Sequence, residues 1–398
     1  MPRTLLVTND FPPRPGGIQS FVHNLAIRLP AGSLTVYAST WSGPAGSGAA
    51  GPAGSGAVGP TAFDAAQPFE VIRADTTMLL PTPKVAREAV RIARSRGCEA
   101  VWFGAAAPLG LLADGGSGLV AGLRRRAGIT RVVGLTHGHE VGWAALPGAR
   151  QLLRRIARGA DVLTYLGEYT RVRLDRAVGG LTALERLVPG VDVDTYHPDV
   201  DGSEIRRRHG LAADRPVVVC VSRLVPRKGQ DVLIRALPAI RRRVPDAAAL
   251  IVGGGPYRAV LERLAREAGV ADAVRFTGNV PWAELPAHYA AGDVYAMPCR
   301  TRRAGLDVEG LGIVYLEASA TGLPVVAGDS GGAPDAVLDG RTGFVVAGRD
   351  VGAVADRVAN LLADPELARR LGRAGREWVT RDWRWQTQAD RLRDLLAG

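Results

Sequence analysis

Short apolar runs of β type recur along this chain, and apolar residues at helical spacing follow most of them. Residues 4–10 form the first run, a turn rich in proline and glycine ends it, and a helical pattern begins at residue 18. The same β-type pattern returns at 34–39, 99–104, 131–138, 160–166, 216–222, 248–255, 274–280, 294–298 and 324–330. This alternation predicts an α/β fold with parallel, doubly wound sheets.

The length and one interruption of this pattern predict two domains. A chain of 398 residues is too long for one ordinary core, and a polar, proline-bounded segment at 188–198 interrupts the alternation. We therefore predict an N-terminal Rossmann-like domain at 1–190, a C-terminal one at 191–375, and a last helix at 376–398 that crosses back to the first domain. The carboxyl ends of both sheets are expected to face a central cleft.

Residues 42–60 are almost wholly Gly, Ala, Ser and Pro. Such a segment buries too little apolar surface to offset its ordering entropy, so we expect a mobile insertion without chemistry.

The charge balance indicates an anionic partner. The formal net charge is +11, which suits a nucleotide, an acidic membrane surface or a nucleic acid. Aromatic residues make up only 6%, and no basic cluster is interleaved with them, so we expect no nucleic acid partner. Without a leader signal or a long apolar run, the chain is expected in the cytoplasm. The single cysteines Cys98, Cys220 and Cys299 predict neither a disulfide nor a metal site.

Two basic side chains follow the expected strand at 216–222. Arg223 and Lys228 lie where open α/β sheets bind ligands, and they offer a planar fork and a point charge. A diphosphate would satisfy both. A solvated basic loop is an equally good interpretation of this stretch alone.

Two glutamates flank a glycine-rich helix entry further on. Glu309 lies in the loop, Gly310 and Gly312 precede the helix, and Glu317 lies inside it. The amino terminus of such a helix can receive a phosphate, Glu317 can accept hydrogen bonds from a ribose diol, and Glu309 can contact a sugar hydroxyl. The alternative is a helix with an exposed glutamate at each end.

A glycine pair opens the first helix of the chain. Gly16 and Gly17 let backbone N–H groups approach a phosphate, and Gln19 could meet an acceptor hydroxyl, although a surface position is the more common outcome for a glutamine. The pattern is not G-x-G-x-x-G, which disfavours a dehydrogenase.

The sequence offers two weak candidates for a metal site. His137 and His139 lie at and just after the end of the expected strand at 131–138, but no third ligand is evident. Asp192 and Asp194 spell D-x-D in the expected linker, where a turn is favoured over a cation site. We expect no metal.

Together these motifs resemble the retaining glycosyltransferases of family 4, which have the GT-B fold. Glu309 and Glu317 match E-x7-E, Arg223 and Lys228 match R-x4-K, and Gly16 with Gly17 matches the first glycine loop. The resemblance implies transfer of a sugar from a nucleotide diphosphate without a metal or other cofactor.

The resemblance also implies roles for individual residues. It places Arg223, Lys228, Gly16, Gly17 and Gly312 at the diphosphate, Val280 at the base and Glu317 at the ribose. Glu309 and His137 are the implied catalytic residues, and the departing phosphate takes the proton of the acceptor.

Two basic stripes suggest contact with an anionic membrane. Their members are Lys84, Arg87, Arg91 and Arg94, and then Arg150, Arg154 and Arg158. Solvated helix faces are the alternative. With residues 136–170, these stripes resemble the actinobacterial phosphatidylinositol mannosyltransferases, and among them those that add the second mannose.

This narrower resemblance implies GDP-mannose as donor, phosphatidylinositol monomannoside as acceptor, an α-1,6 link, and association with the inner face of the plasma membrane. Transfer of another sugar to a soluble acceptor such as inositol phosphate remains the main alternative. A non-catalytic protein that binds sugar nucleotides is a further one.

Overall fold

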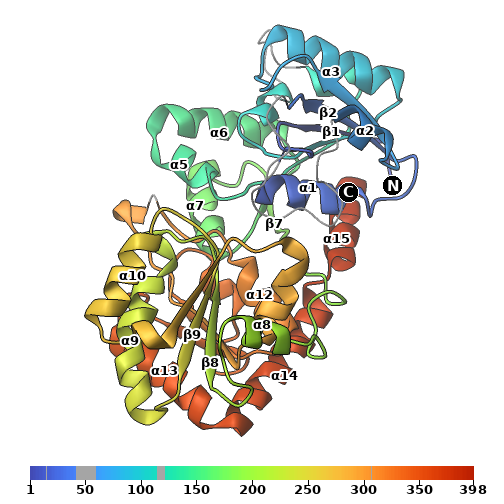
Figure 1. The fold of residues 1–398 in the computed structure, drawn as a ribbon. Helices are drawn as coiled ribbons and strands as arrows, with labels where there is room; N and C mark the ends of the chain where they lie inside the picture. Colours follow the sequence, from blue (N-terminus) through green and yellow to red (C-terminus); the bar gives the residue numbers. More distant parts are fainter. Residues whose placement is uncertain (15, 42–59, 114–121, 306) are drawn as a thin grey trace. The chain divides into compact units, whose positions relative to one another are not determined.

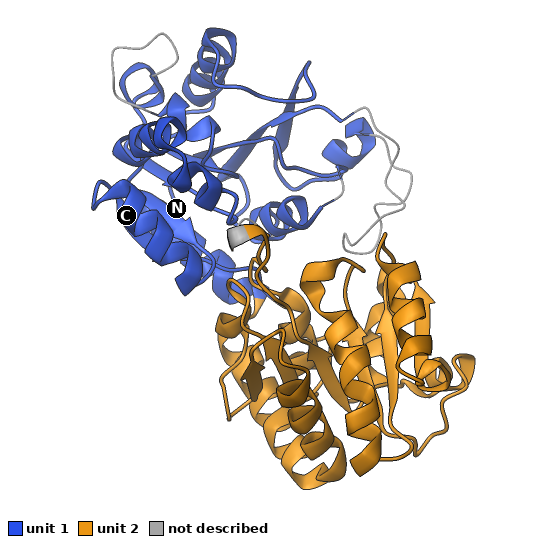
Figure 2. Ribbon diagram, turned by 90° about the vertical axis from the view of Figure 1, so that its left-hand side faces the viewer, with its two compact units in different colours: residues 1–190, 385–398 blue, residues 191–384 orange. Residues whose placement is uncertain are grey.

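The computed structural model describes residues 1–14, 16–41, 60–113, 122–305 and 307–398 (Figure 1). The chain forms two compact units, coloured in Figure 2: unit 1 is Met1–Gly190 with Trp385–Gly398, and unit 2 is Val191–Arg384. Unit 1 ends at Gly190 and resumes at Trp385, whereas the sequence analysis placed the start of the returning segment at residue 376. The insertion expected at 42–60 lies outside the described residues except for its last one.

Unit 1 is built on a parallel sheet of seven strands in the order β3-β2-β1-β4-β5-β6-β7. The strands are β1 Thr4–Thr8, β2 Leu34–Ser39, β3 Glu70–Ala74, β4 Ala100–Phe103, β5 Arg131–Gly134, β6 Val162–Tyr165 and β7 Ala183–Arg186. Its helices are α1 Gly17–Ala26, α2 Pro60–Ala65, α3 Pro83–Ser95, α4 Leu123–Ala127, α5 Glu140–Ala145, α6 Pro147–Gly159, α7 Glu168–Val178 and α15 Trp385–Ala397, with a 3₁₀ turn η1 at Leu109–Leu112.

Successive residues of β1 pack into two separate cores, one on each face of the sheet. Leu6 lies in the core that α1 and α15 cover, whereas Leu5 and Val7 lie in the core that includes α3 and α6. Side chains alternate across a strand, so a strand buried on both faces carries a continuous apolar run, as β1 does from Leu5 to Val7.

Unit 2 has a parallel sheet of six strands in the order β10-β9-β8-β11-β12-β13. The strands are β8 Val217–Val221, β9 Ala248–Val252, β10 Val274–Gly278, β11 Val294–Met297, β12 Val325–Gly328 and β13 Gly343–Val346. The helices are α8 Ser203–Arg208, α9 Gln230–Arg243, α10 Arg258–Glu267, α11 Leu285–Ala290, α12 Ile313–Ala320, α13 Val351–Ala363 and α14 Pro365–Asp382. Short 3₁₀ turns are η2 Pro226–Lys228, η3 Ala271–Ala273, η4 Trp282–Glu284, η5 Arg303–Gly305 and η6 Ala333–Ala336. Figure 1 shows α9 and α13 on one side of β8 and β9, with α12 and α14 on the other.

The two sheets confirm the α/β fold with doubly wound, parallel topology. Three strands that the sequence analysis did not identify are β3, β7 and β13, and each lies at the edge of its sheet. Edge strands bury less surface, so β3 carries a half-exposed sequence of mixed polarity in place of the longer apolar run of a central strand.

The C-terminal region is two helices and not the single long one expected. Helix α14 ends at Asp382, and Trp383 is buried against Trp378 with ring centroids 5.3 Å apart. Helix α15 then places Leu392 and Leu396, both fully buried, in the core beside α1. Each of these leucines contributes about 1.5–3 kcal/mol by burial, so unit 1 depends on the last residues of the chain. No helix in the described part of the chain is both long and apolar enough to cross a bilayer.

Candidate functional site

The strand order of unit 2 creates a topological switch point between β8 and β11. The chain leaves β8 toward β9 and β10 on one side, and β11 pairs with β8 on the other. The loops after two such strands diverge and leave room at the carboxyl edge of the sheet, where open α/β folds bind their ligands. The loop after β8 carries Arg223 and Lys228, and the segment after β11 carries Glu309 and Gly312.

Lys228 and Glu309 meet at this switch point. The Lys228 Nζ lies 2.8 Å from the Glu309 Oε2, and the two side chains are only 11% and 8% exposed. The Arg227 Nε is 3.6 Å from the same oxygen. Lys228 is one of only two lysines in a chain rich in arginine, so the compact ammonium group is itself a signal that sequence analysis could have used.

Arg223 has an exposed side chain on a fixed backbone. The Gln230 side-chain amide donates to the Ser222 Oγ at 2.8 Å and to the Arg223 carbonyl at 3.0 Å. Within the described residues, the Arg223 guanidinium forms no ion pair. Arg223 is therefore available to an incoming anion, whereas Lys228 is already paired.

A buried ion pair joins the two loops of the switch point. Both terminal nitrogens of Arg300 donate to the Asp231 carboxylate at 2.9 Å, and the Arg300 N–H donates to the Arg227 carbonyl at 2.8 Å. Gly229 adopts a φ of 77°, and a Cβ there would lie 1.9 Å from the Pro298 carbonyl oxygen. The sequence analysis did not identify these contacts, because the residues that form them are far apart in sequence and match no local pattern.

Gly312 begins α12 in a left-handed conformation, with φ 79° and ψ 63°. A Cβ at this position would come within 2.5 Å of the Tyr315 ring, so both the backbone and the packing require glycine. The first N–H groups of α12 follow directly, which provides the partial positive charge that a phosphate would meet.

Glu317 and Val280 occupy different surroundings in unit 2. Glu317 is almost fully buried, burial raises its pKa to about 7, and a hydrogen bond from Tyr289 opposes that rise. Val280 is half-buried just after β10, next to Asn279, whose side chain packs against Gly254. The loop after β9 therefore abuts the segment predicted to contact a base.

In unit 1, Gln19 is engaged by a carboxylate that the sequence analysis did not select. The Gln19 Nε2 donates to the Asp10 Oδ1 at 2.7 Å, and Gln19 is 7% exposed, so it is not a surface residue. Burial raises the pKa of Asp10, while Arg14 lowers it. Asp10 directly follows β1, a position at which a polar residue could have been recognised.

The two glycines of the first loop differ in what they require. A Cβ on Gly16, with φ 155°, would lie 2.0 Å from the Gln19 Oε1. A Cβ on Gly17 would meet no atom within 4 Å. The backbone conformation of Gly16 therefore favours glycine, whereas position 17 is open to a side chain.

His137 lies at the carboxyl end of β5 with its ring held in one tautomer. The His137 Nε2 is 2.6 Å from the Gly104 carbonyl oxygen. Because a carbonyl only accepts, Nε2 carries the proton and Nδ1 remains an acceptor. Burial lowers the pKa of His137 to about 4, so the ring is neutral near pH 7. The His137 and His139 rings stack at 6.3 Å, and the Phe21 ring of α1 meets His137 edge-on at 5.7 Å.

The D-x-D motif forms a turn. The Asp192 carboxylate accepts from the Asp194 and Thr195 backbone N–H groups at 3.1 Å and from the Thr195 hydroxyl at 2.7 Å. Across the described ranges, no group of three or more His, Cys, Asp and Glu side chains is arranged to hold a metal ion.

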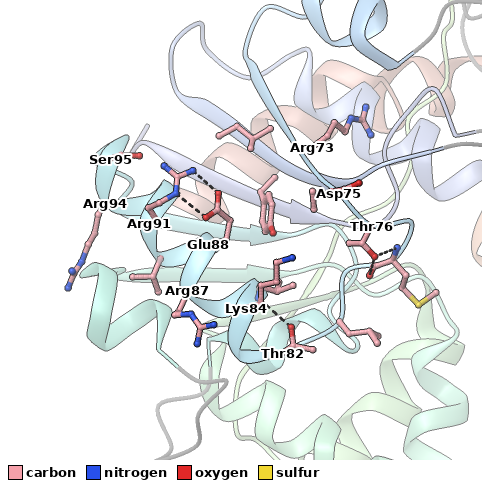
Figure 3. Close-up of a pocket in the computed structure, with 17 residues that line it drawn as sticks. Arg73, Asp75, Thr76, Thr82, Lys84, Arg87, Glu88, Arg91, Arg94 and Ser95 are labelled. Atoms are coloured by element: carbon pink, nitrogen blue, oxygen red, sulfur yellow. Dashed lines mark hydrogen bonds and ion pairs between the residues drawn. The ribbon is translucent and has the colours of Figure 1, made fainter.

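The first basic stripe borders a pocket of about 1300 Å³ in unit 1, beside α3 and β3 (Figure 3). Val85, Ala89 and Ile92 of the same helix are buried. Figure 3 shows Arg91 turned toward Glu88, with which it pairs at 2.6 Å. Three further cations border the pocket without an ion pair to any described residue: Lys84, Arg87 and Arg94. Met78 and Leu80, 54% and 49% exposed, add apolar surface.

The second basic stripe lies on α6 in unit 1. Arg150, Arg154 and Arg158 are exposed, while Leu153 and Ile156 face the core. Leu146, 64% exposed, immediately precedes this helix. Both stripes are therefore on solvent-facing sides of amphipathic helices, as the spacing predicted.

Comparison with known proteins agrees with this architecture. Residues 201–378 match the family model described as "Glycosyl transferases group 1". Among solved structures, Anabaena HepE in complex with UDP is similar with a TM-score of 0.76 at 20% identity, covering 99% of both chains, a likeness that concerns the fold.

Curated relatives match over nearly their full lengths, and two of them show the range of identity. The GDP-mannose-dependent alpha-(1-6)-phosphatidylinositol monomannoside mannosyltransferase of Mycolicibacterium smegmatis is 56% identical over 99% of this chain and 98% of that protein. The GDP-mannose-dependent monoacylated alpha-(1-6)-phosphatidylinositol monomannoside mannosyltransferase of Corynebacterium glutamicum is 45% identical over 99% of this chain and 97% of that protein. The chain belongs to the family of GDP-mannose-dependent phosphatidylinositol monomannoside mannosyltransferases, glycosyltransferases with the GT-B fold.

Proposed function

We propose that this protein transfers mannose from GDP-mannose to phosphatidylinositol monomannoside, forming an α-1,6 link with retained anomeric configuration. The observation that carries this proposal is the Lys228–Glu309 pair at the switch point of unit 2, in a chain that matches known mannosyltransferases along its whole length. The product is the dimannoside used to build phosphatidylinositol mannosides and lipoglycans.

The reaction needs stabilisation of the departing diphosphate. The bond between the mannose anomeric carbon and the β-phosphate oxygen breaks, the acceptor hydroxyl oxygen bonds to that carbon on the same face, and its proton passes to the departing phosphate oxygen. The Arg223 guanidinium, the Lys228 ammonium and the α12 amino terminus after Gly312 supply positive charge for the phosphates. We therefore expect catalysis without a divalent metal.

The remaining side chains of the site act on uncharged groups. Glu309 accepts a hydrogen bond from a mannose hydroxyl, Glu317 accepts one from the ribose, and the base lies against the segment at Val280. His137, neutral and with Nδ1 free to accept, suits contact with the mannose, while Gly16 allows backbone approach to the phosphate. Because Gln19 is bonded to Asp10, any contact of Gln19 with the acceptor involves this pair.

A donor and acceptor panel tests the activity. Purified protein is incubated with labelled GDP-mannose and lipids containing phosphatidylinositol monomannoside, and mass spectrometry is expected to detect the dimannoside. A chelator should leave the rate unchanged. Transfer from a UDP-sugar to inositol phosphate would support the alternative function, whereas donor binding without any transfer would support a non-catalytic binding protein.

We further propose that α3 and α6 bring the protein to the inner, anionic leaflet of the plasma membrane. Lys84, Arg87 and Arg94 lie beside exposed Met78 and Leu80, which combines charge attraction with apolar contact. Flotation with vesicles tests this proposal. Binding should require anionic lipid and weaken with salt, and equal binding to neutral vesicles would contradict it.

A further inference from the structure

One carboxylate oxygen of Glu317 is held by a tyrosine from a different helix. The Tyr289 hydroxyl donates to the Glu317 Oε2 at 2.6 Å, and the two residues are 0% and 4% exposed. Tyr289 comes from α11, and Glu317 comes from the second turn of α12. No other hydrogen bond from a described residue reaches the Glu317 carboxylate, which leaves Oε1 available to a ligand.

The ring of Tyr289 is fixed by aromatic neighbours, so its hydroxyl has one direction. Tyr196 meets the ring edge-on at 5.6 Å, and Tyr295 lies at 5.8 Å on another side. Tyr196 also meets Trp282, two residues beyond Val280, at 6.3 Å. This aromatic cluster connects the Glu317 carboxylate to the segment expected to contact the base.

We propose that Tyr289 is a positioning residue for nucleoside recognition, holding the Glu317 carboxylate so that its second oxygen accepts a hydrogen bond from the ribose of the donor. The inference rests on the proposed ribose contact of Glu317. A buried carboxylate without a donor would rotate and would favour its protonated form, and both changes weaken acceptance from a ribose hydroxyl.

The ionisation of Glu317 gives the inference a second signature. Tyr289 on α11 donates to the Glu317 carboxylate, and the rings of Tyr295 on β11 and Tyr196 in the linker pack against Tyr289. Burial raises the pKa of all three tyrosines. The nearby Arg376 of α14 donates to the Ala320, Val193 and Tyr196 carbonyls. Tyr289 is thus the group that opposes the burial of Glu317 and lowers its pKa.

The test compares GDP with 2′,3′-dideoxy-GDP by calorimetry in wild type and Tyr289→Phe. Wild type should prefer GDP by about tenfold or more, because a site built to bond a hydroxyl discriminates against its absence. Tyr289→Phe should bind GDP about tenfold more weakly and lose most of that preference. The reason is that the substitution and the missing ribose hydroxyls each remove the same hydrogen bond between Glu317 and the ribose. Tyr295→Phe is the matched control, since its hydroxyl donates to the Val221 carbonyl at 3.0 Å.

The outcomes separate the two hypotheses. If wild type binds GDP and 2′,3′-dideoxy-GDP equally well, Glu317 does not contact the ribose, and the proposed function of this residue is wrong. A full preference retained in Tyr289→Phe, or an equal loss in Tyr295→Phe, would overturn the role of Tyr289 alone. If Tyr289→Phe does not fold, the preference of wild type for GDP over 2′,3′-dideoxy-GDP is measured against pH instead. This preference should decline as the pH falls below 7, because Glu317 is then protonated. A preference that does not depend on pH would overturn the inference.

Discussion

The carboxyl edges of the two sheets differ in how they treat charge. In unit 2, Lys228 and Glu309 carry opposite charges and pair at 2.8 Å, with Arg227 beside them. In unit 1, burial lowers the pKa of His137 and raises that of Asp10, so each group moves toward its neutral form. Two parallel sheets whose first six strands follow the same order thus present an ion pair at one carboxyl edge, and at the other groups whose charged forms burial disfavours.

Of the substitutions predicted here, Glu309→Gln should have the largest effect, and it tests the ion pair at the carboxyl edge of unit 2 directly. We expect kcat to fall about 100-fold, because a contact to the transferring sugar is weakened. GDP affinity should hold or increase, because Lys228 is released from its carboxylate partner. Steady-state kinetics and calorimetry measure the two quantities, and Glu262→Gln on α10 is the control. A parallel loss of GDP affinity and kcat would show that Glu309 supports the fold of the site.

Lys228→Ala should lower kcat/KM about 30-fold, corresponding to about 2 kcal/mol for one lost charge-assisted contact. Both donor affinity and rate should decrease, and kinetics with varied GDP-mannose measures them. The exposed Arg266 of α10 provides Arg266→Ala as a matched removal of charge. Unchanged kinetics in Lys228→Ala would show that the Lys228 ammonium does not bind the diphosphate, and the charge at the carboxyl edge of unit 2 would then have no role in the reaction.

The buried imidazole of His137 in unit 1 leads to a prediction about pH. An NMR titration should find the pKa of His137 near 4, with no change in its ionisation between pH 6 and 8. Since the unfolded chain takes up this proton near pH 6.5, the contribution of His137 to stability is complete above that pH and is lost between pH 6.5 and 4. Thermal unfolding should therefore show wild type losing stability relative to His137→Gln over this range, and a constant difference would contradict the neutral histidine.

The basic stripe of α3 should give the smallest effects. Arg87→Gln and Arg94→Gln should each weaken binding to anionic vesicles by about fivefold. Arg91→Gln should have less effect, because Arg91 already pairs with Glu88 on the same helix. Flotation at fixed salt compares the three variants. Equal losses would mean that net charge alone, and not the unpaired cations beside the pocket, governs attraction to the membrane.

The central strands and most motifs of the candidate site were predictable from local sequence. Strands β1, β8 and β9 are buried on both faces and therefore read as continuous apolar runs. The edge strands β3 and β7 have half-exposed sequences of mixed polarity, which carry no comparable signal. The break between α14 and α15 was missed because both helices are amphipathic. Its causes are tertiary: Trp383 is buried, its carbonyl accepts from the Val191 N–H at 2.7 Å, and Arg384 forms a β-bridge with Val191.

The pattern of residues along the chain was sufficient to predict two α/β domains and the positions of Arg223, Lys228, Glu309 and Gly312 at strand ends and helix starts, because strand period, helix period and glycine conformation are local properties. Which side chains meet was decided only by the folded chain. Lys228 pairs with Glu309, Asp231 with Arg300, and Tyr289 with Glu317, each across a long separation in sequence. Such pairs form because the parallel sheet brings its loops to one edge, where burial makes an unpartnered charge or hydroxyl costly.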